Sequence, residues 1–428
     1  MTDIAVEHDS VTTSATDTDA RWERSPWSGV ASPEELNHWS AVADGVASDL
    51  ADGARERDRS GALPREAVEV LKTSGLVDLI VPAEAGGAGA HWETAFRAVR
   101  AIARVDASLG QILGYHYLNQ ACITFYGGDR ERQLDWYRAS VRGGATPGGW
   151  LWSDSFNPVS PDLSLVADGD GYVLNGLKRF ATGAAVADVV IAGAVAEGGE
   201  LDGQLAVFAL PTNRDGIRFL DDWDNIGYRA SASGSVRYTD VRVETSDVIG
   251  VDAGEPFSSV VTPGVQLLFG NIYLAVAEGA LAQAKELTLA RPNSWFLSGV
   301  DTYADDPITH RTFGELVSRA AAVRALADAL NRRFDEAIAL GGATTAEDRA
   351  ELEVAVAQLK VVATEMSLDV TSRVFDLTGA SSTKTSIGLD RFWRDVRTHS
   401  LHDPVEYKKI EVGANYLTGA VQPVSLYT

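Results

Sequence analysis

The sequence predicts a mainly α-helical protein with one β-rich domain in its middle. Apolar residues recur at three- and four-residue steps in both end regions, whereas short β-rich runs separated by turn residues fill the middle. Strands and long helices do not alternate, so a Rossmann-type sheet is not expected. A chain of 428 residues is also too long for one simple core. We therefore predict three folded parts, over 31–143, 144–255 and 256–428, after a disordered polar tail over 1–30.

The composition excludes several classes of protein. Acidic residues outnumber basic ones by 60 to 37, and the resulting net charge of −23 repels nucleic acid and anionic membranes. No run approaches the roughly 20 apolar residues of a membrane helix. Cys122 is the only cysteine, which excludes an internal disulfide, a zinc knuckle and an iron–sulfur cluster. We expect a cytoplasmic protein, without a secretory signal, that binds neither nucleic acid nor membrane.

The N-terminal part is expected to be helical. Ser32 can act as N-cap, Pro33 suits the first helical position, and Glu35 completes a predicted capping box. Apolar residues then lie on one helical face: Leu36, Trp39, Ala43, Val46 and Leu50. A further helix is predicted at 64–72, before the glycine-rich turn AEAGGAGAHW, and two more are predicted after it, at about 91–104 and 107–126.

Short strands dominate the middle of the chain. DVVIAGAVA, QLAVFALP, GIRFL and SGSVRYTDVRV are β-rich runs separated by turn residues. The stretch GYVLNGLKRFA carries Asn175 and Gly176 between strand-like flanks, a pair that favours a two-residue hairpin turn. The spacing predicts a compact antiparallel barrel or sandwich over about 145–250.

The C-terminal part is helical again. Its clearest helix begins at a predicted capping box of Thr344 and Glu347 and continues to Gly379, about nine turns at 3.6 residues each. One apolar stripe runs along it: Leu352, Val356, Leu359, Ala363, Met366, Val370, Val374 and Leu377. Long helices with one apolar stripe predict a four-helix bundle, with surface left for contacts between subunits.

Two histidines near the end of the chain are candidate functional residues. RFWRDVRTHSLHDPVEYK places His399 and His402 three residues apart, with Asp403 adjacent. One helical turn supplies at most two or three metal ligands, and no partner cluster occurs elsewhere, so we predict no metal site. Dinucleotide-binding, P-loop, HExxH and GxSxG motifs are absent. Taken alone, three arginines of this stretch are typical of a solvated helix face with salt bridges: Arg391, Arg394 and Arg397.

Several longer stretches resemble the acyl-CoA dehydrogenase superfamily, over roughly 33–428. LIVPAEAGGAGA is similar to that family's P-E-x-G-G-x-G turn, NGLKRFATGAAVAD to its β-domain segment beside the flavin, and FDLTGA to its cofactor-phosphate region. The I-Y-E-G-T segment with the dehydrogenases' catalytic Glu is absent, as is their T-E-P…G-S-D stretch. DRFWRDVRTHSLHDPVEYK, GYHYLN and DDWDNIGYRASASGS are instead similar to the flavin-dependent monooxygenase branch, especially to its dibenzothiophene-oxidising members.

The resemblance implies an acyl-CoA-dehydrogenase-like three-domain fold, a homotetramer and a two-component monooxygenase reaction. FMN would arrive reduced from a separate NAD(P)H-dependent flavin reductase and react with O₂ to give a flavin hydroperoxide. This would pass one oxygen to the sulfur of a small, flat aromatic thioether such as dibenzothiophene, giving the sulfoxide and then the sulfone. An apolar, tryptophan-rich pocket suits a substrate with few hydrogen-bonding groups.

The same resemblance assigns candidate catalytic residues. A flavin hydroperoxide must keep its proton and stay dry. We expect His402 to manage that proton, since imidazole changes charge near neutral pH, with Asp403 in a weaker, orienting role. His116, in GYHYLN, is the second imidazole, although a lone histidine on an apolar helix is also typical of a satisfied core residue. Thr182 lies where the family places a serine hydroxyl on the flavin.

Further residues are expected around the cofactor and the substrate. Phe180 should pack on the flavin ring and Trp223 should line the flavin or substrate side, although both are also typical of a plain core. The phosphate region reads GASSTKTS where the family carries an arginine, so we expect hydroxyls and an ammonium to bind phosphate there. These candidates are Ser381, Ser382, Thr383 and Lys384, with Arg291 of ARPNSW near the family's intersubunit arginine. The substrate pocket is expected to include Tyr115, Asn119, Trp150 and Trp152.

Three alternatives remain open. A flavin enzyme of the same branch could hydroxylate nitrogen or carbon of an indole, amine or amino sugar, and Asp154 in the pocket would favour a cationic amine. An acyl-CoA dehydrogenase would need Asp403 or Glu406 as its base. A flavin-free scaffold would keep the bundle for oligomerisation alone.

Overall fold

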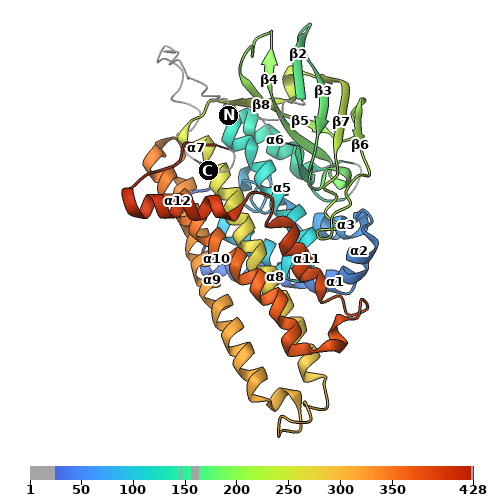
Figure 1. Cartoon of the computed structure of the whole chain (residues 1–428). Coiled ribbons are helices and arrows are strands. Elements are labelled where there is room, and N and C mark those ends of the chain that lie inside the picture. The colour runs from blue at the N-terminus through green and yellow to red at the C-terminus, as the bar shows by residue number, and fades with distance from the viewer. Residues whose placement is uncertain (1–24, 145–146, 156–162, 426–427) are drawn as a thin grey trace, which may run out of the picture.

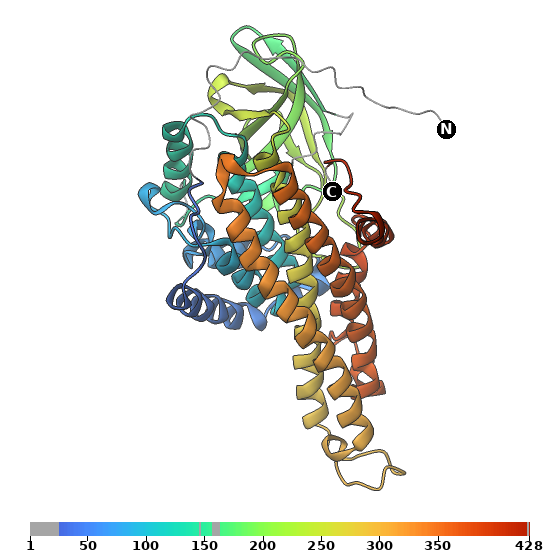
Figure 2. The same cartoon turned by 90° about the vertical axis from the view of Figure 1, so that its left-hand side faces the viewer.

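The computed structural model describes residues 25–144, 147–155, 163–425 and 428. The β-domain lies at one end of two adjoining helical parts (Figure 1). Three long helices, α8 (Val261–Leu289), α9 (Pro307–Ala339) and α10 (Ala346–Thr378), extend side by side away from it (Figure 2). The predicted fold class, mainly helical with a central β-domain, is confirmed.

The N-terminal part consists of helices α1 (Pro33–Ala51), α2 (Ala54–Ser60), α3 (Arg65–Thr73), α4 (Trp92–Val105), α5 (Ala107–Tyr126) and α6 (Arg130–Arg142). Ser32 caps α1 as predicted, accepting a hydrogen bond from the Glu35 N–H at 3.1 Å. The predicted capping box is wrong. The Glu35 carboxylate accepts the His91 N–H at 2.8 Å and the Thr94 hydroxyl instead, because it is drawn to the unpaired N–H groups at the start of α4.

Trp27, which falls in the predicted tail, belongs to the folded core. Its side chain is buried, its Nε1 donates to the Ile80 carbonyl at 2.8 Å, and its ring meets Trp92 edge-on at 5.4 Å. The folded part therefore begins before α1. The rest of the predicted tail, residues 1–24, lies outside the described residues.

The β-domain is a mixed sheet, so the prediction of a wholly antiparallel domain is wrong. Its strands are β1 (Trp152–Ser155), β2 (Leu163–Asp168), β3 (Gly171–Lys178), β4 (Val189–Glu197), β5 (Leu205–Pro211), β6 (Ile217–Phe219), β7 (Val236–Val243) and β8 (Val248–Asp252). The order is β6-β7-β3-β2-β4-β5-β8, with β1 also on β4. β4 pairs in parallel with β1 and β2, and the other pairings of the described strands are antiparallel. Parallel pairing joins strands distant in sequence and leaves no local turn signal.

The predicted hairpin at Asn175-Gly176 is wrong, because β3 runs straight through both residues. The pairing of β3 with β7 shifts register between Leu174 and Gly176, which makes this a bulge. Opposite it stands Asp240 with φ 48°; its N–H donates to Asn175 Oδ1 at 2.8 Å, and Asn175 Nδ2 donates back to its carboxylate. The turn that joins β2 to β3 lies instead at 169–170, where Gly169 has φ 60°.

The C-terminal part adds α7 (Pro256–Ser259), α11 (Asp390–His399) and α12 (Val405–Thr418) to the three long helices. The long helix predicted from Thr344 to Gly379 is present as α10. Its capping box uses Thr345 and Asp348, one residue later than predicted, since Thr345 has the extended backbone that an N-cap needs. The Thr344 hydroxyl instead donates to the Gly341 carbonyl at 2.7 Å.

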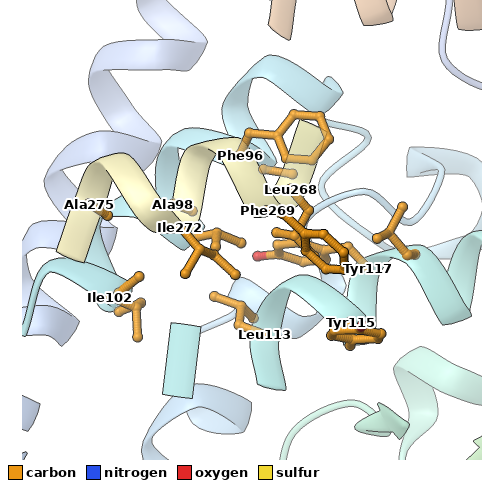
Figure 3. Close-up of a cluster of buried hydrophobic side chains, with 14 of the residues drawn as sticks. Phe96, Ala98, Ile102, Leu113, Tyr115, Tyr117, Leu268, Phe269, Ile272 and Ala275 are labelled. Carbon is orange, nitrogen blue, oxygen red and sulfur yellow. The ribbon is translucent and has the colours of Figure 1, made fainter. Parts of the chain in front are cut away.

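Helix α8 is the centre of the core. Its Leu268, Phe269 and Ile272 pack among side chains of α4 and α5 such as Phe96 and Leu113 (Figure 3). Within the described residues, Pro256–Leu289 is long and apolar enough to cross a membrane by length and composition, but 89% of its most apolar window is buried inside the protein. It is therefore a buried core helix.

Helix α11 joins the bundle to the loop between β6 and β7. A Cβ at Gly227 would lie 2.2 Å from the Arg394 carbonyl oxygen, so only glycine permits this approach. The next N–H, of Tyr228, donates to Asp395 Oδ1 at 2.7 Å, and Arg394 pairs with Asp58 of α2 at 2.6 Å. Arg391 is buried and donates to the Val105 carbonyl at 2.7 Å. The interpretation of these arginines as a solvated face is therefore wrong for Arg391.

Stability should depend on pH through Asp395. Burial raises the pKa of this carboxyl from 3.8 to about 7, against the lowering effect of the Tyr228 N–H and the nearby arginines. Its contribution to folding is thus full below the unfolded-state pKa and is lost as the pH rises through about 7. Asp395→Asn keeps an oxygen for the Tyr228 N–H but cannot ionise. By urea unfolding, we expect its stability relative to wild type to grow by roughly 1.4 kcal/mol per pH unit between about pH 5 and 7 and then to level off. A difference independent of pH would contradict this.

Candidate active site

His402 lies in the turn between α11 and α12, beside two buried charged groups. Its Nδ1 is 3.2 Å from Asp403 Oδ1, and the same oxygen accepts a hydrogen bond from Lys360 Nζ of α10. The His402 side chain is 39% exposed, whereas those of Asp403 and Lys360 are buried. Burial alone would raise the pKa of Asp403, but His402 and Lys360 outweigh it and hold the pKa well below its ordinary value. Asp403 therefore stays a carboxylate beside the imidazole.

An aromatic wall stands next to His402. It consists of Tyr115 of α5, Phe269 and Tyr273 of α8, Tyr228 and His399. The Phe269 ring lies 5.1 Å from His402, 4.5 Å from His399 and 6.3 Å from Tyr115, and the Tyr228 ring lies 5.2 Å from His399. The Tyr273 hydroxyl is 2.9 Å from His399 Nδ1. Burial lowers the pKa of His399 well below its ordinary value, so its ring is neutral.

A ladder of hydroxyls connects Thr182 to this wall. The Ser233 hydroxyl donates to Thr182 Oγ1 at 3.1 Å and lies 2.7 Å from the Ser231 hydroxyl, and all three side chains are buried. The Ser231 N–H donates to the Tyr228 carbonyl at 3.0 Å. Loop 228–233 thus contacts Thr182 through Ser233 and contributes Tyr228 to the aromatic wall.

Phe180 and Trp223 flank the same loop. Trp223 Nε1 donates to the Tyr228 carbonyl at 2.8 Å, and its ring meets Phe180 edge-on at 6.3 Å. Phe180 is 64% exposed and has φ 58°, a backbone conformation that costs a bulky residue energy. A hollow lined in part by Ala184, Leu220 and Trp223 opens beside this pair. Phe180 is therefore not a core residue.

His116, the second predicted catalytic imidazole, is buried and bound to the backbone through both ring nitrogens. Its Nε2 lies 2.6 Å from the Val77 carbonyl oxygen, and its Nδ1 accepts the Trp152 N–H at 3.0 Å. Burial lowers its pKa to about 4. With both ring nitrogens bound to the backbone and the ring neutral, His116 ties α5 to the start of β1.

Two predicted pocket residues, Trp150 and Trp152, pack on each other beside α6. Trp152 is buried, its Nε1 donates to the Ser140 hydroxyl at 2.8 Å, and its ring contacts Trp136 of α6 at 6.0 Å. Trp150 packs on Trp152 at 6.4 Å. The two tryptophans pack beside α6 because it offers a hydroxyl and an apolar face to them, and their place in the substrate pocket stays a prediction. Asn119 is buried and donates to the Tyr115 carbonyl within α5 at 2.7 Å.

The predicted phosphate-binding residues lie at the other end of α8. Arg291 donates to the Thr378 carbonyl at 2.9 Å, and Ser382 bonds the Gly379 carbonyl at 2.7 Å, whereas Ser381, Thr383 and Lys384 are exposed. Thr288, which contacts this group, follows Phe269 by 19 positions (288 − 269) along α8, a distance of about 28 Å at 1.5 Å per residue. Within one chain these residues therefore lie about 28 Å along α8 from the aromatic wall.

The chemistry of the wall and the ladder fits the ring of a flavin. Tyr228 Oη and His399 Nε2 are buried without a hydrogen-bond partner among the described residues, as expected where a ligand with polar edges completes a site. Phe180 and Trp223 add aromatic surface, and Thr182 adds a hydroxyl. No group of three or more possible metal ligands occurs in the described part of the chain.

Sequence reasoning missed Lys360, Gln266, Phe269 and Ser233. Phe269 and Gln266 sit inside an apolar helix, and Lys360 interrupts the apolar run of α10, where its 1% exposed side chain bonds Gln266 Oε1 at 2.6 Å. A lysine between Leu359 and Val361, within such a run, was the available signal.

Three family models match most of the chain. They describe the N-terminal, middle and C-terminal domains of acyl-CoA dehydrogenase and match residues 32–143, 156–241 and 267–407. The match to separate models for the three parts agrees with the mixed architecture of helices, sheet and helices.

Individual relatives are more specific. The chain is 38% identical over 390 residues to dibenzothiophene monooxygenase of Mycolicibacterium goodii, covering 87% of this chain and 92% of that protein. It is 36% identical to the probable FMNH₂-dependent monooxygenase SfnC of Pseudomonas putida, covering 87% and 93%. The crystal structure of TdsC from Paenibacillus sp. A11-2 with FMN and indole matches with a TM-score of 0.86 at 32% identity, covering 92% of this chain and 100% of that one. The chain therefore belongs to the acyl-CoA dehydrogenase superfamily and, within it, to the flavin-dependent monooxygenases.

Proposed function

We propose that this chain is the oxygenase of a two-component system that S-oxygenates an aromatic thioether such as dibenzothiophene, first to the sulfoxide and then to the sulfone. It is a flavin-dependent monooxygenase that uses FMN, with O₂ as co-substrate. A separate NAD(P)H-dependent flavin reductase supplies the FMN in reduced form. Bound reduced FMN supplies the two electrons with which O₂ gives one oxygen atom to the substrate and the other to water.

The observation that carries this proposal is the meeting of a protonatable imidazole, an aromatic wall and a buried hydroxyl ladder around loop 228–233. His402 can hold or deliver one proton at Nε2 while Asp403 holds Nδ1. The Thr182 hydroxyl, fixed by Ser233, can bond a polar edge of the flavin ring. The wall keeps water from the reacting atoms.

The same geometry disfavours an acyl-CoA dehydrogenase. That reaction needs a free carboxylate to take a proton from carbon. Asp403 is buried in a pair with Lys360, and its lowered pKa makes it a poor base. Glu406 is exposed and pairs with Lys409 at 2.9 Å. Neither candidate base is available.

The aromatic wall supports a flat aromatic substrate, because stacking and edge contacts need no hydrogen bonds. Hydroxylation of an indole is the second candidate, and the indole bound by TdsC supports it. Asp154, which would favour a cationic amine, has a side chain outside the described residues. Competition between dibenzothiophene and indole as substrates separates the two.

A homotetramer completes the cofactor site in this proposal. Since Arg291 and Ser381–Lys384 lie about 28 Å along α8 from the wall, they would bind the flavin phosphate of a neighbouring subunit. The exposed end of α8 at Leu289 and Ala290, together with exposed Ser381, Thr383 and Lys384, leaves this region open to such a neighbour.

Without the His402 imidazole, the protein should no longer hold the proton that the flavin–oxygen intermediate needs. After reduced FMN and His402→Ala protein are mixed with oxygenated buffer, we expect a transient absorbance, distinct from reduced and oxidised flavin, to decay at least about a hundredfold faster than in wild type. Hydrogen peroxide should accumulate in place of oxygenated product. Stopped-flow absorbance and a peroxide assay measure both. Reoxidation of the wild type at the rate of free FMN would overturn the proposal.

The Thr182 hydroxyl should matter separately from its methyl group. Thr182→Val keeps the shape and should weaken FMN binding about tenfold, by roughly the free energy of one buried hydrogen bond. Thr182→Ser, the matched control, should bind as wild type does. Fluorescence titration with FMN measures both, and equal affinities for the two variants would argue against a hydroxyl contact with the flavin.

Mixed oligomers should reveal the shared site. His402→Ala and Arg291→Ala subunits are each expected to be inactive, but co-expressed and purified as mixed oligomers they should recover about a quarter of wild-type activity. Mixing His402→Ala with His402→Gln, both altered on the ring side, should recover none. Failure of the first mixture would show that Arg291 serves its own chain or no cofactor at all.

A further inference from the structure

We propose that Lys360 is a positioning residue that neutralises Asp403, so that Asp403 can orient His402 without holding it as a permanent cation. The inference deepens the proposed function and rests on the role of His402 in it. It adds a third, buried member to the imidazole–carboxylate pair.

Lys360, Asp403 and His402 form one continuous series of contacts. Lys360 reaches from α10 into the core with its side chain 1% exposed. Its Nζ donates to Asp403 Oδ1 and, at 2.6 Å, to Gln266 Oε1 of α8, and it lies 5.2 Å from the centre of the Phe269 ring. Both acceptors and the ring face hold the ammonium in place, and Asp403 Oδ1 bridges it to His402 Nδ1.

The charge of Lys360 decides what Asp403 does to His402. A lone carboxylate 3.2 Å from an imidazole favours the protonated ring by one to three pH units. A ring held as a cation cannot take up a proton in one step and return it in another. The Lys360 ammonium on the same oxygen cancels most of the negative field of Asp403 at His402. The hydrogen bond from Asp403 to His402 Nδ1 remains and still orients the ring. His402 is then oriented through Nδ1 by a carboxylate whose charge is largely cancelled.

The surrounding titratable groups leave this balance intact. Neutral His399 of α11 and the Tyr273 phenol of α8 face the pair, and burial raises the pKa of Tyr273 well above its ordinary value. From α12, Lys408 and Glu411 act on Lys360 in opposite senses and pair with each other at 2.9 Å. Burial lowers the pKa of Lys360 to about 8, although Asp403 opposes this. The ammonium form is thus retained at neutral pH chiefly through Asp403.

Stability alone does not explain this lysine. A buried ion pair often contributes no more to folding than apolar residues of the same volume. Other buried pairs of the C-terminal part, such as Lys408 with Glu353 at 3.1 Å, join α10 to α12 without contact to an imidazole. The Lys360 pair is the one that ends at His402.

The test is a double-mutant cycle of the two charges, measured by titration of the His402 ring in the protein without flavin. Four variants are compared with wild type by NMR of the His402 ring, assigned with His402→Gln: Lys360→Met, Asp403→Asn, the double variant, and Lys360→Arg. Lys360→Met should move the titration of the ring to higher pH by about one unit or more. Asp403→Asn should move it the other way. The double variant should return close to wild type, and Lys360→Arg should stay there. Thermal unfolding confirms that each variant is folded.

Activity provides the second readout. In Lys360→Met, the acid limb of the pH profile for substrate oxygenation should move upward by the same amount as the NMR titration, with peroxide release increased below it. A purely structural lysine would lower activity at all pH values without moving the limb.

The two proposals fail in different ways. An unmoved His402 titration in folded Lys360→Met, or shifts of the same sign in both single variants, would overturn the role of Lys360. If the NMR shifts occur but His402→Ala oxygenates substrate as wild type does, the charge coupling stands and the proposed function fails.

Discussion

The close burial of α8 is the constraint on which the rest of the structure depends. Its glycines let neighbours reach the backbone: a Cβ at Gly270 would lie 2.7 Å from Leu359, and one at Gly279 would lie 2.1 Å from the Arg104 carbonyl oxygen. Packing this tight leaves no room for water, so the polar side chains of α8 need protein partners. Gln266 finds Lys360 and Tyr273 finds His399, both at the candidate site. The position of α8 thus helps to bring the polar groups of the candidate site together.

The polar groups of the site come from several separate elements, and none of these elements alone satisfies their hydrogen bonds. A lysine comes from α10, a carboxylate and an imidazole come from the turn after α11, and a hydroxyl ladder comes from the β-domain. Most of these groups satisfy one another, but Tyr228 Oη and His399 Nε2 stay unpaired within the described residues. Buried groups of this kind cost stability when unpaired. Their presence on two neighbouring rings, 5.2 Å apart, is understandable if a flavin or a substrate completes them.

Local patterns predicted local structure well and predicted contacts poorly. The N-cap at Ser32, the extent of α10 and the main strands follow from side-chain spacing, because helix and strand periods are properties of neighbouring residues. Glu35 could not be placed from its own segment, since its partner His91 lies 56 residues away. Asn175 lies in a bulge because Asp240 opposes it, and a local hairpin pattern holds no information about a partner 65 residues away. The resemblance to known enzymes singled out His402 as a candidate. Lys360, the counter-charge of Asp403, was visible only in the three-dimensional structure.

The conformation of Phe180 bears on how long a flavin stays bound. A bulky residue at φ 58° with 64% exposure carries about 1–3 kcal/mol of backbone strain and presents an apolar face to water before any ring arrives. A side chain that is already in place needs no rearrangement on binding, which favours fast association. In the proposed two-component reaction the flavin would enter reduced and leave oxidised in each cycle, so its residence time would have to match turnover. If Phe180 packs on the flavin as proposed, its conformation suits a cofactor that is exchanged in the manner of a substrate, in contrast to a prosthetic group that is retained for the life of the protein.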